Sequence, residues 1–146
     1  MQIKTIIICD NILYRLGCNE EGKQMQITYL CAKHEDWIYN NPEQALHFMA
    51  RDEMQGTLLL HCGQYTEAIP YIGCAFDIAV ILLEVDGGEN DALIHKVKSL
   101  AGLLEETYYH LNLPNYRNAI LDRTHSVLQA TESALLSAFL LKSVHQ

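Results

Sequence analysis

Basic residues are scarce in this chain. Lysine and arginine number 10 against 18 aspartate and glutamate residues, which gives a formal net charge of −8. Phosphate backbones repel an anionic protein, so we expect no nucleic-acid partner. Solubility is the simplest explanation of the charge, and attraction of a basic segment of a partner is the alternative.

Signals for export or membrane insertion are also lacking. Uninterrupted apolar runs stay well below the roughly 18 residues that a membrane-spanning helix needs. The apolar start, residues 1–9, is followed by Asp10 and Asn11 where a signal peptide would carry small residues for cleavage. We therefore expect the start to belong to the fold, and we expect no membrane partner.

Paired cysteine motifs are missing as well. The five cysteines are odd in number, have no CxxC spacing and mostly lie in apolar surroundings. A disulfide framework is therefore not expected, and buried, reduced thiols predict a cytoplasmic protein.

What is present is a series of helical patterns in a single domain, residues 1–146, of which 49% are hydrophobic. Asn41, Pro42 and Glu43 are typical of a helix start, and the apolar spacing that follows predicts a helix to about residue 62. Further apolar repeats predict helices from Tyr65 to a stop at residues 86–88, from residues 90–91 to about 111, and from Pro114 to about 143. These four helices form two antiparallel hairpins.

The first forty residues are ambiguous. Residues 3–16 suit a helix ending at Gly17, although Ile6, Ile7 and Ile8 also suit a strand. Residues 24–29 alternate as a strand does, whereas residues 25–32 also fit one helical face leading to Trp37. We favour two further helices here, which predicts an all-α protein of about six helices, with a β-structured start as the alternative.

Residues 51–84 resemble a tetratricopeptide repeat, a helix–turn–helix unit of about 34 residues. Gly56 and Ala68 stand at its small positions, where they let the two helices approach. Leu59 and Ile72 replace its two aromatic residues. The turn and the second helix match further through Gly63, Tyr65 and Ala75.

The chain also departs from the repeat pattern. Asp52, Gln55 and Val80 replace its Trp, Leu and Pro. Pro70 falls inside the second helix, where it predicts a kink or a late start. One repeat length further on, no second copy is detectable, so a helical bundle with a similar turn is the alternative.

The resemblance implies a partner-binding face. Proteins with this repeat bind partners through the first helix of each hairpin. The matching positions are Ala50, Glu53, Thr57, Leu60 and His61. Glu53 implies an apolar or basic protein or peptide partner rather than an acidic peptide terminus.

No residue pattern predicts catalysis, a cofactor or a metal. The seven histidines include no HExxH pair, and no glycine-rich phosphate loop is present. Glu106 and His110 are four residues apart on one helix face. With His61, they define the runner-up, a small helical enzyme or metal-binding bundle. A helical domain with a closed apolar cavity for a small ligand is the third alternative.

The last helix is apolar on nearly every side between residues 134 and 141. Such a helix is normally buried, so we expect the first helices to wrap it. A homodimer interface or a partner-docking surface is the alternative. Together these patterns predict a non-catalytic protein–protein interaction module: an adaptor, a regulator or a chaperone-like protein.

Overall fold

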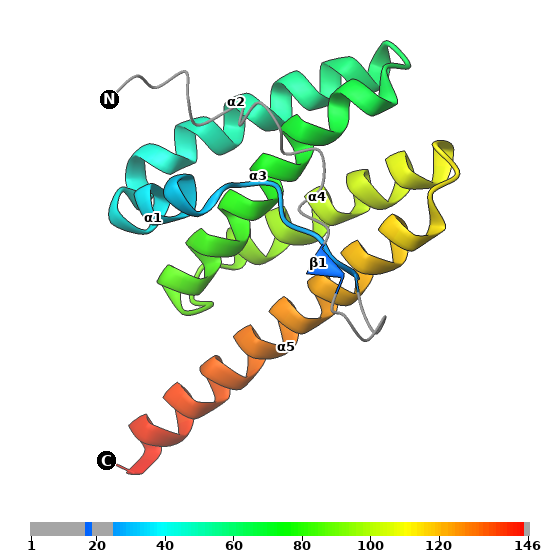
Figure 1. The fold of residues 1–146 in the computed structure, drawn as a ribbon. Helices are drawn as coiled ribbons and strands as arrows, with labels where there is room; N and C mark the ends of the chain where they lie inside the picture. Colours follow the sequence, from blue (N-terminus) through cyan, green and yellow to red (C-terminus); the bar gives the residue numbers. More distant parts are fainter. Residues whose placement is uncertain (1–16, 19–24, 145–146) are drawn as a thin grey trace.

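A computed structural model of the protein describes residues 17–18 and 25–144, and over these residues the fold is all-α. Its five helices are α1 (Ala32–Asn40), α2 (Pro42–His61), α3 (Tyr65–Asp86), α4 (Asp91–His110) and α5 (Pro114–Val144), and α3 lies at the centre of the bundle (Figure 1). Two short antiparallel strands, β1 (Gly17–Cys18) and β2 (Met25–Gln26), precede them.

The four long helices and their two antiparallel hairpins are confirmed, with ends close to those predicted. α3 ends as expected at Gly87, whose φ of 74° is readily adopted by glycine. The Asn90 side chain caps α4 by accepting a hydrogen bond of 2.9 Å from the Ala92 backbone N–H. Local capping chemistry thus places these boundaries.

The starts of α2 and α3 each differ in one detail from the simplest reading of the local sequence. The Asn41 side chain makes no capping hydrogen bond to α2, and its amide group donates to the Trp37 carbonyl oxygen at 2.8 Å. The late start of the second helix is also not found, since α3 already begins at Tyr65 and continues through Pro70. Pro70 is the sixth residue of α3, so its missing N–H removes one helical hydrogen bond, to the Thr66 carbonyl oxygen, and the helix nevertheless continues to Asp86.

The helix favoured from residue 25 toward Trp37 is found only in its later part. After β2 the chain runs without helix through residues 27–31, and α1 begins only at Ala32. The described residues contain five helices, so the count of about six for the whole chain stays a prediction. The helix expected over residues 3–16 lies outside the described residues.

Close helix packing occurs where the sequence has small residues. A Cβ added to Gly56 of α2 would lie 2.4 Å from Cγ1 of Ile72 in α3. Ala68 is fully buried at the same hairpin. The physical expectation that small residues let α2 and α3 approach is therefore confirmed.

α3 is the most apolar helix of the bundle. By length and hydropathy alone α3 could cross a membrane, but 72% of its most apolar window is buried within the protein. Burial on this scale is typical of the central helix of a helical domain.

The described cysteines form no disulfide with one another. Cys74 is buried, Cys31 is half-buried, and Cys62 is exposed at the end of α2. The expectation of buried thiols therefore fails for Cys62. The side chains of Cys9 and Cys18 lie outside the described part of the chain.

A buried carboxyl group on α2 carries an energetic cost. Asp52 is fully buried, and neither of its carboxyl oxygens has a hydrogen-bond partner in the described structure. Burial raises the pKa of Asp52 to about 7, although the charge of the neighbouring Arg51 acts in the opposite direction. The folded protein therefore holds this proton more tightly than the unfolded chain does.

Replacing Asp52 with Asn should change how stability depends on pH. Because the pKa of Asp52 is raised on folding, its contribution to stability falls as pH rises from about 4 to about 7, then levels off. At pH 8 we expect Asp52→Asn to be more stable than the parent by on the order of 2 kcal/mol, with little difference near pH 4. Urea titrations of the two proteins across this pH range would measure the difference in their free energies of unfolding. A difference that does not change with pH would contradict the prediction.

Candidate functional site

The α2 face that the resemblance implied lies along one continuous helix. Of its five residues, Ala50 and His61 are exposed. The other three are partly buried: Glu53, Thr57 and Leu60. The Thr57 hydroxyl donates to the Glu53 carbonyl oxygen at 2.7 Å, so it is satisfied within the helix. Leu60 packs in part against the core.

An ion pair alters the charge of this α2 face. Lys96 of α4 donates to both carboxylate oxygens of Glu53, at 2.8 and 3.0 Å. Glu53 is therefore already neutralised from within the protein. Any attraction between this face and a basic peptide is weaker than Glu53 alone would suggest.

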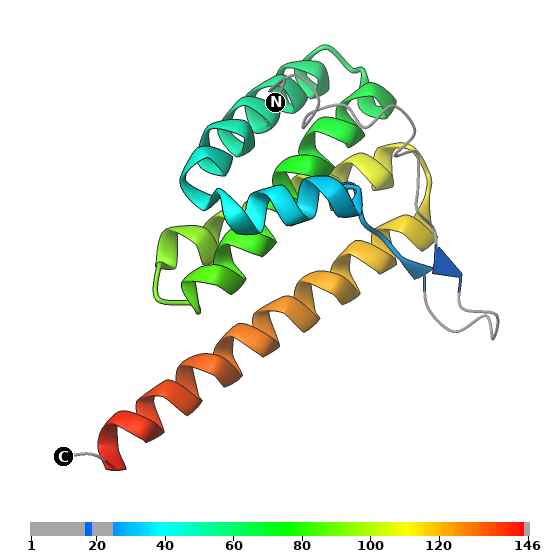
Figure 2. The ribbon, with the colours of Figure 1, turned by 60° about the vertical axis from the view of Figure 1, so that its left-hand side comes forward.

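A different surface stands out on α5. We call residues 132–143 the α5 tip. In Figures 1 and 2 this part of α5 extends beyond the other helices. Its large apolar side chains are exposed: Leu135 by 37%, Leu136 by 59%, Phe139 by 67%, Leu140 by 54% and Leu141 by 63%.

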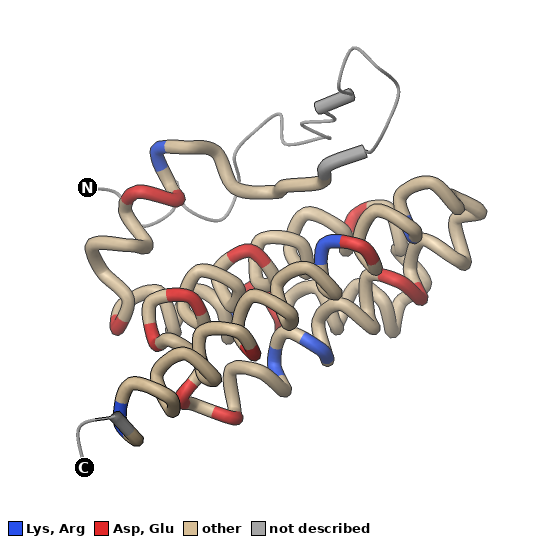
Figure 3. Tube along the Cα trace, turned by 90° about the horizontal axis from the view of Figure 1, so that it is seen from below, with Lys and Arg blue, Asp and Glu red and all other residues tan. Residues whose placement is uncertain are grey.

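Within the described residues no helix wraps the α5 tip, so the expected wrapping is not found there; the helix expected over residues 3–16 lies outside them. The N-terminal half of α5 is instead the buried part, with Ala119 and Ile120 in the core. The trace close to the C-terminus is mostly without charge (Figure 3). Contiguous exposed apolar surface of this kind marks interaction sites in soluble proteins.

A shallow apolar groove continues this surface toward the bundle. It has a volume of about 180 Å³ and lies between the C-terminal end of α3 and the middle of α5. Its lining residues are Val80, Leu83, Glu84, Gly87, Val127, Ala130, Thr131 and Ala134. The groove and the tip together form an apolar strip along α5.

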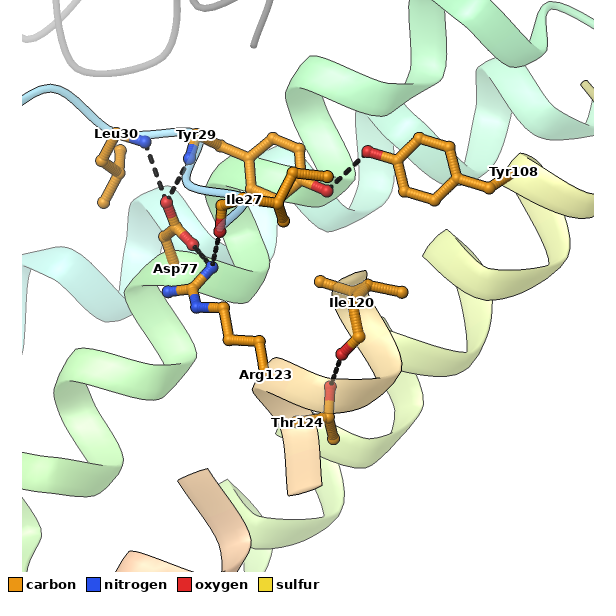
Figure 4. Close-up of polar contacts among 8 residues, drawn as sticks. All are labelled: Ile27, Tyr29, Leu30, Asp77, Tyr108, Ile120, Arg123 and Thr124. Carbon is orange, nitrogen blue, oxygen red and sulfur yellow. Dashed lines mark hydrogen bonds and ion pairs between the residues drawn. The ribbon is translucent and has the colours of Figure 1, made fainter. Parts of the chain in front are cut away.

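The N-terminal part of α5 is held by a buried polar cluster (Figure 4). Asp77 of α3 pairs with the Arg123 guanidinium of α5. Its other oxygen accepts hydrogen bonds from the backbone N–H groups of Tyr29 and Leu30, at 2.6 and 2.9 Å. Arg123 also donates to the Ile27 carbonyl oxygen at 3.0 Å.

The same cluster extends to α4 through two tyrosines. The Tyr29 and Tyr108 hydroxyls are 2.6 Å apart, and the Tyr29 ring lies against Gly73 of α3. Burial is the main reason why the pKa of Tyr29 is raised well above its ordinary value. Because Asp77 and Tyr29 are buried, we assign the cluster a structural role: it joins residues 27–30 to three helices.

This cluster was not predicted from the sequence. The available signal was Asp77 itself, a charged residue within an otherwise apolar helical stretch. Such a residue predicts a buried partner of opposite charge. Nothing local in the sequence indicates that the partner is Arg123, 46 residues further along.

The residues of the catalytic or metal-binding alternative are poorly placed for that role. His110 Nε2 and Glu106 Oε1 are 3.8 Å apart, too far for a good hydrogen bond, and both side chains are largely exposed. The His110 ring instead stacks on Tyr65, with ring centroids 4.8 Å apart. In the described part of the chain, no group of three His, Cys, Asp or Glu side chains could hold a metal ion.

One thiol–imidazole contact occurs at the start of α1. Cys31 Sγ lies 3.2 Å from His34 Nδ1. Burial, with a smaller contribution from the charge of Lys33, lowers the pKa of His34. The neutral imidazole is therefore favoured, which suits a role in packing.

Comparison with known proteins adds no assignment. No protein-family model matches the chain, and neither a curated protein nor a solved structure matches it.

Proposed function

We propose that the protein is a non-catalytic protein–protein interaction module that docks through the α5 tip. One observation carries this proposal: Leu136, Phe139 and Leu140 are each more than half exposed on a helix that extends beyond the bundle. Leaving this much apolar surface in water is unfavourable, and covering it with another protein recovers about 25 cal/mol per Å².

The architecture agrees with this role. The buried Asp77–Arg123 pair holds the N-terminal part of α5, so the exposed part can project from a fixed base. Stacked helical hairpins, as in tetratricopeptide repeats, commonly serve as binding scaffolds. We propose an adaptor, regulator or chaperone-like role in the cytoplasm, with the α2 face as a second contact surface for an apolar or basic segment.

Capture of partners from native cells by surface variants would test the proposal. We expect Leu136→Glu with Leu140→Glu to lose a reproducible set of partners, because acidic side chains cannot enter an apolar contact. Glu53→Lys with Leu60→Ala tests the α2 face separately. The measurement is quantitative mass spectrometry of captured proteins.

The matched control is Met54→Glu, which makes the same kind of change at a methionine of α2 that is 63% exposed. Met54 lies on α2, away from the α5 tip, so this variant should still capture the partners that the tip variant loses. Because Met54 follows Ala50 by four residues on the same side of α2, it is a control for the tip alone. If the tip variant and the parent capture identical sets, the α5 tip is not the docking surface.

A further inference from the structure

The α5 tip carries one outward row of side chains. Glu132, Leu136, Phe139 and Ser143 follow one another at spacings of four, three and four residues, so they lie on one side of the helix. Leu136 and Phe139, at the centre of the row, are 59% and 67% exposed. A row with this spacing is the pattern by which two helices pack along each other.

We propose that the occupant of this surface is a second copy of the protein, paired through two antiparallel α5 tips. This inference rests on the proposed function of the α5 tip as a protein-docking surface. In the pair, Leu136 of each copy packs against Phe139 of the other, and Leu140 covers the side of the contact. The arrangement has two-fold symmetry, in which one patch binds its own copy.

Charge complementarity sets the direction of the pair. Glu132 and Lys142 are the only charged residues between positions 132 and 143, and they lie at opposite ends of the tip. Antiparallel pairing brings Glu132 of each copy level with Lys142 of the other. Parallel pairing would instead bring Glu132 beside Glu132 and Lys142 beside Lys142, which is repulsive.

The size of the contact predicts its strength. A stable interface typically buries about 800 Å² on each partner, and a three-turn helix contact buries less. We therefore expect a weak dimer that dissociates on dilution. A lipid surface fits the tip less well, because Lys142 is its only basic residue and the net charge of −8 opposes anionic membranes.

Sedimentation velocity on the full chain tests the pair. Reducing buffer is needed because Cys62 is exposed and could form an unrelated disulfide dimer. From low micromolar to several hundred micromolar protein, we expect a reversible monomer–dimer equilibrium. Phe139→Glu should weaken it by at least about 100-fold, whereas Met54→Glu should leave it unchanged.

A charge-reversal series tests the direction. Glu132→Lys creates two lysine–lysine contacts in the antiparallel pair and should weaken dimerisation by about tenfold. Adding Lys142→Glu to the same chain restores opposite charges and should recover the parent affinity. If Glu132→Lys has no effect, the antiparallel pair is wrong.

Two outcomes would overturn the second copy as the occupant: a parent protein that stays monomeric throughout, or a Phe139→Glu variant that still dimerises. If the parent is monomeric but the tip variants lose captured partners that are other proteins, the proposed function stands and only the dimer is wrong. Tip-dependent flotation with phosphatidylcholine vesicles, in place of any protein contact, would overturn both.

Discussion

Replacing Asp77 with alanine is expected to destabilise the protein by about 3–5 kcal/mol. The carboxylate of Asp77 is the shared partner of the Arg123 guanidinium and of the backbone N–H groups of Tyr29 and Leu30. Without it, a partly buried charge and two buried N–H groups lose a partner. Each of these groups would then stay away from water without a hydrogen-bond partner, which is unfavourable.

Chemical denaturation of the variant and the parent would measure this change. Asp122→Ala is the matched control, because Asp122 is an exposed aspartate next to Arg123, and we expect a change within about 0.5 kcal/mol. Asp77→Ala with Arg123→Leu should recover part of the loss, since it removes the isolated charge as well. A loss below about 1 kcal/mol for Asp77→Ala would contradict the central role of this cluster.

The helix boundaries could be predicted because their causes are local. Pro42 at a helix start, Asn90 as a cap and Gly87 after a helix end each act on the backbone within a few residues. The position of α1 was harder to predict. Ile27, Tyr29 and Leu30 are all buried in an extended segment, and the contacts that hold them come from α3 and α5.

The candidate site was only half predictable for a similar reason. The apolar character of residues 134–141 is visible in the sequence, and so is the need to cover it. Which element covers it depends on the direction of α5 relative to the bundle. The contact of Arg123 with Asp77 helps to hold that direction, and no local pattern specifies a contact between residues 46 positions apart.

Replacing Gly73 with leucine is expected to have the second large effect on folding, because there is no space for a side chain at this position. Even a Cβ added to Gly73 would lie 2.1 to 2.5 Å from three atoms of the Tyr29 ring. Real Cβ contacts are never this short, so the ring must move. Movement of the ring would also break the hydrogen bond between the Tyr29 and Tyr108 hydroxyls.

We expect Gly73→Leu to cost at least about 3 kcal/mol, through overpacking and the lost hydrogen bond. Gly73→Ala gains roughly 1 kcal/mol of helix propensity and should still be destabilising overall. Gly102→Ala is the matched control, because Gly102 is an exposed helical glycine with nothing within 4 Å of an added Cβ. It should stabilise α4 by about 0.5–1 kcal/mol.

Thermal and urea unfolding of the two alanine variants, side by side, would separate packing from backbone effects. If Gly73→Ala lowers the free energy of unfolding and Gly102→Ala raises it, the Tyr29 ring and not the helix backbone determines the result at position 73. If both variants were stabilised equally, residues 27–31 would not be packed on α3 as described. Tyr29→Ala removes the ring that an added Cβ would meet. Gly73→Ala should therefore cost less stability in the Tyr29→Ala background than in the parent.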